Sequence, residues 1–108
     1  MTKARAIRGT RFLHLLAPCP PGWRTAGEET IELARQAVHC RVFPLIDIED
    51  GQRWRFSMDH PDEPVAPYVR RQVRFGHLTD EQISRARARY VCATTERTRA
   101  GGAAGGDV

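Results

Sequence analysis

One short and almost continuous apolar run stands near the N-terminus of the chain, at residues 11–17. The run reads Arg-Phe-Leu-His-Leu-Leu-Ala and is bounded by Gly9 and Pro18. Its length, with apolar residues on both faces, is typical of a strand buried inside a sheet. We therefore predict a buried strand over residues 11–17. Residues 1–10 have weak helical spacing and are compatible with the remnant of a helix that enters this strand.

Helical periodicity follows in residues 28–38. The acidic residues of this segment lie in its first turn, where the helix dipole favours them. Ile31, Ala34 and Val38 mark one face, which we expect to be the buried one. Thr25 stands three residues before a glutamate, the spacing of a capping box.

Two further helices are predicted in the second half of the chain. Residues 64–75 form the first, and Gly76 ends it. Its inner side is expected to consist of Val65, Tyr68 or Val69, Gln72 and Phe75. A capping box at residues 79–82, Thr-Asp-Glu-Gln, opens the second, which runs through Ile83 and Ala86 to Tyr90.

A β-hairpin is predicted between these helical regions. Residues 42–49 and 53–57 alternate between apolar and polar side chains, and Asp50-Gly51 between them is a strong turn signal. Pro44 places the hairpin at the edge of a sheet, because proline cannot donate to a ladder on both sides.

One buried strand, one edge hairpin and about three helices place the chain in the α/β class. A strand buried on both faces needs neighbours on both sides, which these elements do not supply. We expect residues 1–92 to be the C-terminal portion of a larger α/β domain. Residues 93–108 are expected to be a disordered tail, because the stretch rich in Gly and Ala after Thr98 buries little.

Charge first suggests a nucleic-acid partner, since the net charge is +4 and the pI is near 9.5. The distribution argues against it, because most arginines are interleaved with acids. No zinc-finger spacing, aromatic RNA-binding signature or helix-turn-helix pattern accompanies the two basic stripes at residues 70–74 and 85–89. We expect solvated helix faces there and no nucleic-acid binding.

The sequence also bears on the cellular compartment and on contact with membranes. No apolar run approaches the ~20 residues of a membrane helix. The N-terminus is basic but has no apolar signal-peptide core, so we expect a cytoplasmic protein without membrane contact. The three cysteines are irregularly spaced and are expected to be reduced thiols.

Cys19 has the most restricted backbone of the three cysteines. It lies in the sequence Ala-Pro-Cys-Pro-Pro-Gly-Trp, residues 17–23, directly after the predicted strand. The prolines on both sides of it lock the backbone, and Gly22 permits a tight turn. Such a loop suits a thiol that must be held in one orientation toward a binding partner. The alternative is an ordinary buried cysteine in a proline-rich turn.

The remaining candidates favour structural roles. Cys40 and Cys92 are expected to be small packing residues, and His14 is expected to be a satisfied core histidine within the strand. A zinc site from Cys19, His39, Cys40 and Cys92 is conceivable, but no pair has the spacing of a zinc knuckle.

Four blocks of the sequence resemble one known family. They are the Ala-Pro-Cys-Pro-x-Gly-Trp loop, Thr-Ile-Glu-Leu-Ala-Arg-x-Ala-Val, Phe-Pro-Leu-Ile-Asp-Ile-Glu-Asp-Gly, and a Pro-Val-x-x-Tyr…Gln-x-Arg-Phe-x-His-Leu pattern ending at Leu78. In order and spacing they resemble the C-terminal part of the thiamine-pyrophosphate-binding β subunit of 2-oxoacid:ferredoxin oxidoreductases, of the pyruvate synthase type. The resemblance covers roughly residues 7–90.

The resemblance implies a role for Cys19. In this family the cysteine of the corresponding loop is one of four thiolate ligands of a 4Fe-4S cluster near the thiamine pyrophosphate. The implied reaction is oxidative decarboxylation of a 2-oxoacid to an acyl-CoA, with electrons passed through iron–sulfur clusters to ferredoxin. The implied partners are the remaining part of the β subunit and the α and γ subunits.

The sequence also departs from the family pattern. It contains no Cys-x-x-Cys, which would supply further cluster ligands, and no Gly-Asp-Gly motif for thiamine pyrophosphate and magnesium. We therefore expect a fragment or split piece that contributes one ligand and is not catalytic alone. The alternative is a non-catalytic remnant or a small basic interaction module.

Overall fold

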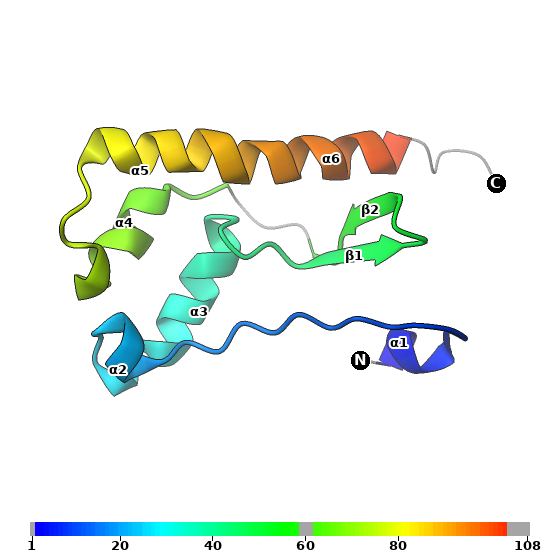
Figure 1. The fold of residues 1–108 in the computed structure, drawn as a ribbon, viewed down its shortest axis with the longest axis horizontal. Helices are drawn as coiled ribbons and strands as arrows, with labels where there is room; N and C mark the ends of the chain where they lie inside the picture. The colour runs from blue at the N-terminus through cyan, green and yellow to red at the C-terminus, as the bar shows by residue number, and fades with distance from the viewer. Residues whose placement is uncertain (1, 59–61, 104–108) are drawn as a thin grey trace.

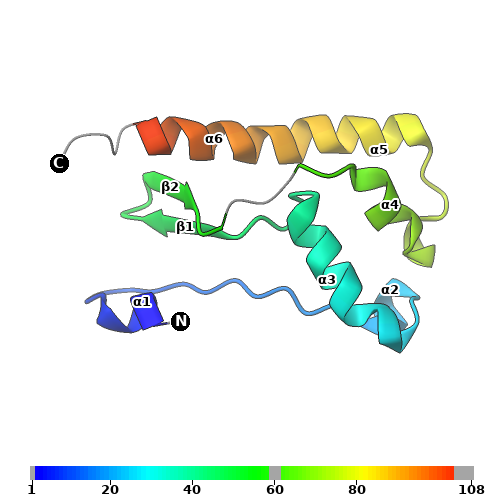
Figure 2. The same ribbon diagram turned by 180° about the vertical axis from the view of Figure 1, so that it is seen from behind.

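The computed structural model describes residues 2–58 and 62–103. In chain order its elements are α1 (Thr2–Ala6), α2 (Pro20–Trp23), the 3₁₀ turn η1 (Gly27–Glu29), α3 (Thr30–His39), β1 (Ile46–Glu49), β2 (Arg53–Phe56), α4 (Val65–Arg70), the 3₁₀ turn η2 (Val73–Phe75), α5 (Asp80–Ala86), the π-helical turn η3 (Arg87–Val91) and α6 (Cys92–Ala103). Figure 1 shows α5 and α6 as one long rod, with the hairpin, α3 and α4 beneath it. The N-terminal segment runs along the opposite side of the molecule, as the reverse view in Figure 2 also shows. No helix within the described ranges is long and apolar enough to cross a membrane.

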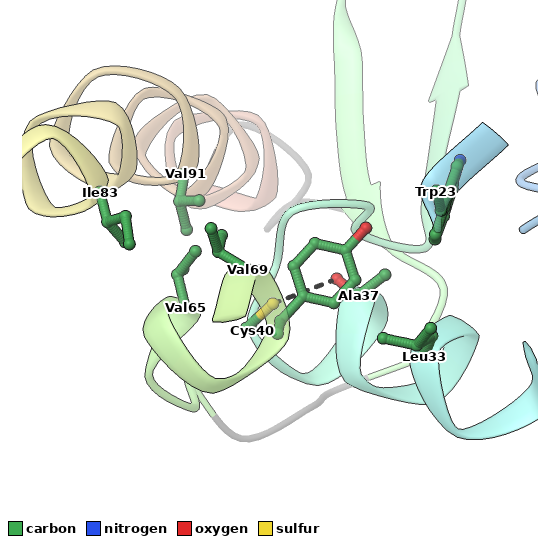
Figure 3. Close-up of a cluster of buried hydrophobic side chains, with 9 residues drawn as sticks. Trp23, Leu33, Ala37, Cys40, Val65, Val69, Ile83 and Val91 are labelled. Atoms are coloured by element: carbon green, nitrogen blue, oxygen red, sulfur yellow. Dashed lines mark hydrogen bonds between the residues drawn. The ribbon is translucent and has the colours of Figure 1, made fainter. Parts of the chain in front are cut away.

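The hydrophobic core lies in the helical half of the chain. Its buried members come from α2, α3, α4, α5 and η3 and their flanks: Trp23, Leu33, Ala37, Cys40, Val65, Tyr68, Val69, Ile83 and Val91. Figure 3 shows these side chains converging between the helices. The loop that carries Cys19 is therefore anchored to the best-packed part of the molecule, through Trp23.

Helix α3 confirms the predicted helix but not its predicted buried face. Leu33 and Ala37 are fully buried, whereas Ile31 is 68% exposed. Both sets of residues have helical spacing, so only the position of α4 decides which face is covered. The predicted capping box at Thr25 is absent; instead the turn η1 precedes the helix, and the Thr30 hydroxyl donates to the Gly27 carbonyl at 2.6 Å.

The second predicted helix ends earlier than expected. Val65 and Gln72 are buried as predicted, Tyr68 and Val69 are both buried where one of the two was expected, and Phe75 is partly buried. The helix α4 nevertheless stops at Arg70. Gln72 has an extended backbone (φ −101°, ψ 107°), and the 3₁₀ turn η2 follows it. This break lets the Gln72 side chain turn back to donate to the Tyr68 carbonyl at 3.0 Å.

The third predicted helix starts as expected and extends further. Its capping box is confirmed: the Gln82 backbone N–H donates to the Thr79 hydroxyl at 3.2 Å, and the Thr79 N–H donates to the Gln82 side chain at 2.9 Å. The helix then continues through η3 and α6 to Ala103. Residues 93–103, which were expected to belong to a disordered tail, are therefore helical, and residues 104–108 lie outside the described residues.

The predicted hairpin is confirmed. Strands β1 and β2 pair antiparallel, with Ile46 opposite Phe56. Asp50 and Gly51 both have positive φ (54° and 70°), as the tight turn of a hairpin requires. Within the described residues these are the two strands of a single sheet. The hairpin lies against α6 (Figure 1).

The predicted buried strand at residues 11–17 is wrong for the chain as it stands. This segment is extended but forms no ladder with any described residue. Phe12, Leu13 and Leu15 are 88%, 54% and 68% exposed. Among the described residues β1 and β2 pair with each other, and residues 11–17 do not join their ladder. The observed fold is helical with one small sheet, and it is compatible with the α/β class only in that coarse sense.

The molecule is also less compact than an independent domain of its size. Its radius of gyration is 15.9 Å, whereas a compact domain of this length has about 13 Å. The long α5–α6 rod and the extended N-terminal segment account for the difference (Figure 2).

Candidate functional site

Cys19 occupies the position directly before helix α2, which is a single turn made by Pro20, Pro21, Gly22 and Trp23. Two prolines suit the start of a helix, because the first N–H groups of a helix have no partner within it. The Cys19 backbone is extended (φ −112°, ψ 101°), and its carbonyl accepts the Trp23 N–H at 2.8 Å. This backbone hydrogen bond closes the turn that begins at Cys19.

The thiol of Cys19 is exposed, and Gly22 keeps it so. A Cβ atom placed on Gly22 would lie 3.5 Å from Cys19 Sγ, which is ordinary van der Waals contact. Position 22 is therefore close enough to the sulfur for a larger side chain to contact it. Cys19 is reduced and exposed, as a ligand or reactive thiol requires. The alternative of a buried cysteine in a turn does not describe this position.

The turn is held against the core by a stacked arginine. The Arg74 guanidinium lies over the Trp23 ring at 4.4 Å from its centroid and over the Phe75 ring at 4.5 Å. The same guanidinium donates two hydrogen bonds to Gln72 Oε1, at 3.0 and 2.7 Å. Since Gln72 is fully buried, the arginine is fixed in place. Trp23, and with it the cysteine turn, is therefore attached to η2.

An ion pair adds a second link between the same regions. Arg71 donates to Glu29 Oε1 through Nη2 at 2.9 Å and through Nε at 3.3 Å, and both side chains are about one-third exposed. This pair joins η1 to the end of α4. The roles of Arg71 and Arg74 were not predicted from local patterns, because their partners lie far away along the chain.

The other two cysteines lie apart from this site. Cys40 is buried in the core, and its thiol lies 3.8 Å from the Ala37 carbonyl (Figure 3). Burial raises the pKa of Cys40 above its usual value, which keeps the sulfur protonated. Cys92 is exposed on α6. Across residues 2–58 and 62–103, no group of three or more His, Cys, Asp or Glu side chains could hold a metal ion, so the conceived zinc site is not formed.

Two of the described histidines, His39 and His14, have ordinary structural environments. His39 lies 3.2 Å from Glu63 Oε1 through Nδ1, at the C-terminal end of α3. His14 is exposed rather than buried in a core, and its ring contacts Phe43 edge-on at 5.1 Å. The expected core histidine is therefore wrong, for the same reason that the strand around it is unpaired.

Chemically, the site offers one exposed, reduced sulfur on a rigid turn. A thiolate on such a turn is a suitable single ligand for a soft metal centre, which needs sulfur atoms at fixed positions. One sulfur cannot complete a cluster, and among the described residues Cys19 belongs to no group of three or more potential metal ligands.

Sequence comparison identifies relatives of this chain. The chain is 42% identical over 83 residues to pyruvate synthase subunit PorB of Methanocaldococcus jannaschii, covering 77% of the chain and 28% of the relative. It is 40% identical over 86 residues to ketoisovalerate oxidoreductase subunit VorB of Pyrococcus abyssi, covering 77% of the chain and 27% of the relative. A further pyruvate synthase subunit PorB, from Methanothermobacter marburgensis, is 41% identical over 80 residues, covering 74% of the chain and 28% of that relative.

The chain is a homologue of part of the 2-oxoacid:ferredoxin oxidoreductase β subunit. It spans a little over a quarter of the length of the curated relatives that it matches. No protein-family model matches the chain. The resemblance found in the sequence blocks is thus confirmed at the level of the family, for a segment of the subunit.

Proposed function

We propose that this chain is a working segment of a 2-oxoacid:ferredoxin oxidoreductase β subunit and that Cys19 supplies one thiolate to a 4Fe-4S cluster of the assembled subunit. The observation that carries the proposal is the exposed Cys19 sulfur, held on a one-turn helix and left uncovered by Gly22. A cluster ligand needs this combination of access and rigidity. The kinship to the pyruvate synthase and ketoisovalerate oxidoreductase subunits supports the cofactor.

The chain's own residues would hold the sulfur and limit its movement. The stack of Arg74 on Trp23 fixes the turn against η2, so a bound cluster would meet a sulfur that has little freedom. When bound, the cluster supplies one-electron transfer, and its potential depends on burial and on hydrogen bonds to sulfur. Thiamine pyrophosphate and magnesium would be held by the remaining part of the β subunit.

The reaction proposed for the assembly is oxidative decarboxylation of a 2-oxoacid to an acyl-CoA, with ferredoxin as electron acceptor and with α and γ subunits as partners. Identity to a pyruvate synthase subunit (42%) and to a ketoisovalerate oxidoreductase subunit (40%) is nearly equal. The proposal therefore names the class of 2-oxoacids rather than one substrate. It includes no membrane and no nucleic-acid partner.

The test is reconstitution of the cluster in a complex of this chain with the unmatched part of the Methanocaldococcus jannaschii PorB subunit. Iron and sulfide are added anaerobically, and iron per complex and visible charge-transfer absorption are measured. Cys19→Ser is expected to lose the 4Fe-4S signature. Cys92→Ser is the matched control, because this thiol is also reduced and exposed, and it should retain the cluster.

Two outcomes would contradict the ligand assignment. One is equal loss of iron in both cysteine variants, and the other is full retention of iron in Cys19→Ser. Either outcome in a stably formed complex would favour the alternative, a non-catalytic remnant or small basic interaction module.

A further inference from the structure

Gln72 is a polar side chain buried at the point where α4 ends and η2 begins. None of its surface is exposed, so its amide must find hydrogen-bond partners inside the protein. It finds them in two directions. Its Nε2 donates to the Tyr68 carbonyl at 3.0 Å, and its Oε1 accepts two hydrogen bonds from the Arg74 guanidinium at 2.7 and 3.0 Å.

These two directions connect the end of α4 with the turn that carries Cys19. The Tyr68 carbonyl lies in the last turn of α4, where carbonyls have no partner within the helix. On the other side, Arg74 lies 4.4 Å from the centroid of the Trp23 ring. Trp23 is the last residue of α2, and its N–H donates to the Cys19 carbonyl at 2.8 Å. Contacts therefore run without a break from α4 through Gln72 to Cys19.

Only an amide side chain can make both sets of hydrogen bonds at position 72. Leucine would fill a similar volume but has neither a donor nor an acceptor. Glutamate would still accept both hydrogen bonds from Arg74, and with a charge on each partner these would be strong. It has no donor for the Tyr68 carbonyl when ionised. The two substitutions therefore separate the hold on Arg74 from the link to α4.

We propose that Gln72 is a positioning residue for Cys19, which holds Arg74 on Trp23 and thereby fixes the sulfur where a cluster would bind. The proposal rests on the proposed function for the cluster, and Gln72 itself touches neither the sulfur nor a metal. The ion pair between Arg71 and Glu29 also joins these regions, but both side chains are about one-third exposed. Water screens such a pair, so we assign the hold on the turn to the buried amide.

Hydrogen exchange in the full chain tests the hold on the turn. Gln72→Leu should accelerate exchange of the Trp23 amide by at least about fivefold, because Arg74 loses its anchor and its stack on the ring weakens. Gln72→Glu should leave that rate close to wild type. Both variants should lower the urea midpoint, since both leave the Tyr68 carbonyl without its donor.

Thr79→Ala is the matched control for lower stability. It removes the cap of α5 and lowers the urea midpoint from a site outside the chain of contacts to Cys19. The Trp23 amide should therefore exchange at the wild-type rate under native conditions in this variant.

Iron retention tests the consequence for the cluster. The full chain is reconstituted with the unmatched part of the Methanocaldococcus jannaschii PorB subunit, and transfer of iron to a chelator is followed. The Gln72→Leu complex should lose iron at least about fivefold faster than wild type, in proportion to the easier opening of the turn. The Gln72→Glu complex should lose iron at the wild-type rate.

Three results would overturn the positioning role. They are wild-type exchange of the Trp23 amide in Gln72→Leu, equally fast exchange in Gln72→Glu and Gln72→Leu, and equal rates of iron loss from these two complexes. Cys19→Ser separates this proposal from the ligand assignment. If that variant kept its iron, the ligand assignment would fail, while exchange in the full chain would still decide whether Gln72 holds the turn.

Discussion

Replacing Arg74 by methionine is expected to loosen the turn that carries Cys19. Methionine has a similar reach but neither the charge nor the hydrogen-bonding fork of arginine. Arg74→Met would therefore remove the stack on Trp23, the stack on Phe75 and both hydrogen bonds to Gln72 Oε1. The Trp23 stack is the contact that holds α2 directly.

The magnitude follows from these contacts. A partly exposed cation–π contact contributes about 1 kcal/mol, so opening of the Cys19 turn should become easier by about fivefold. The buried Gln72 Oε1 would also lose its donors, which costs about 1–3 kcal/mol in the free energy of unfolding. These contributions share one side chain and are not additive, so we expect a total destabilisation below their sum, about 2–3 kcal/mol.

Hydrogen exchange measures the two effects separately. The Trp23 and Thr25 amides donate to the Cys19 and Pro20 carbonyls, at 2.8 and 3.1 Å, and report opening of the turn. Their exchange in the full chain should accelerate in Arg74→Met, while urea unfolding reports the global loss. Arg85→Met is the control, because the Arg85 side chain is 75% exposed and its ion pair with Glu81 lies on the surface.

The reasoning would be refuted if the Trp23 amide exchanged at the wild-type rate in Arg74→Met. It would also be refuted if Arg74→Lys behaved like wild type in both measurements. Lysine keeps the charge but cannot stack on the ring and donate two hydrogen bonds to one oxygen at the same time. We expect it to give an intermediate result.

Three further predictions concern other parts of the chain. Stability should fall as the pH rises above about 9, because burial raises the pKa values of Cys40 and Tyr68 above their usual values of 9.0 and 10.0. The unfolded chain then loses these protons first, so Cys40→Ala should reduce the slope of the urea midpoint against pH between 8 and 10; an unchanged slope would contradict the contribution of Cys40. Thr79→Ala should cost about 1 kcal/mol in urea unfolding through loss of the cap, and Thr79→Ser should restore most of it; equal stability of Thr79→Ala and wild type would contradict the capping role. Gly22→Leu should slow the reaction of Cys19 with an aromatic disulfide reagent, whereas Gly22→Ala should not, and equal rates for both would show that position 22 does not control access.

Elements specified by neighbouring residues were predictable from the sequence. The capping box at Thr79 and the Asp50-Gly51 turn depend on local hydrogen bonds and on backbone dihedral angles, which a few adjacent residues determine. The kinship to the oxidoreductase β subunits was also predictable, because the order and spacing of sequence blocks can be recognised without a structure.

Burial was predictable only where one helical face was clearly apolar. The inner side of α4, with Val65, Tyr68 and Val69, was correctly predicted. The inner face of α3 was not, because Ile31 and Leu33 both have helical spacing and only the packing of α4 against one of them decides. The extent of α6 was missed because its apolar pattern is weak, and its contact with the hairpin strand β2 is visible only in the tertiary structure.

The sequence by itself determined that Cys19 stands in a rigid turn after an apolar segment, because proline and glycine restrict the backbone wherever they occur. Only the tertiary structure decided that the thiol is exposed and that Arg74 fixes the turn through Trp23. It also decided that residues 11–17 remain unpaired in this chain. The physical reason is that exposure and pairing depend on residues distant in the sequence, or on another polypeptide, and no local pattern contains them.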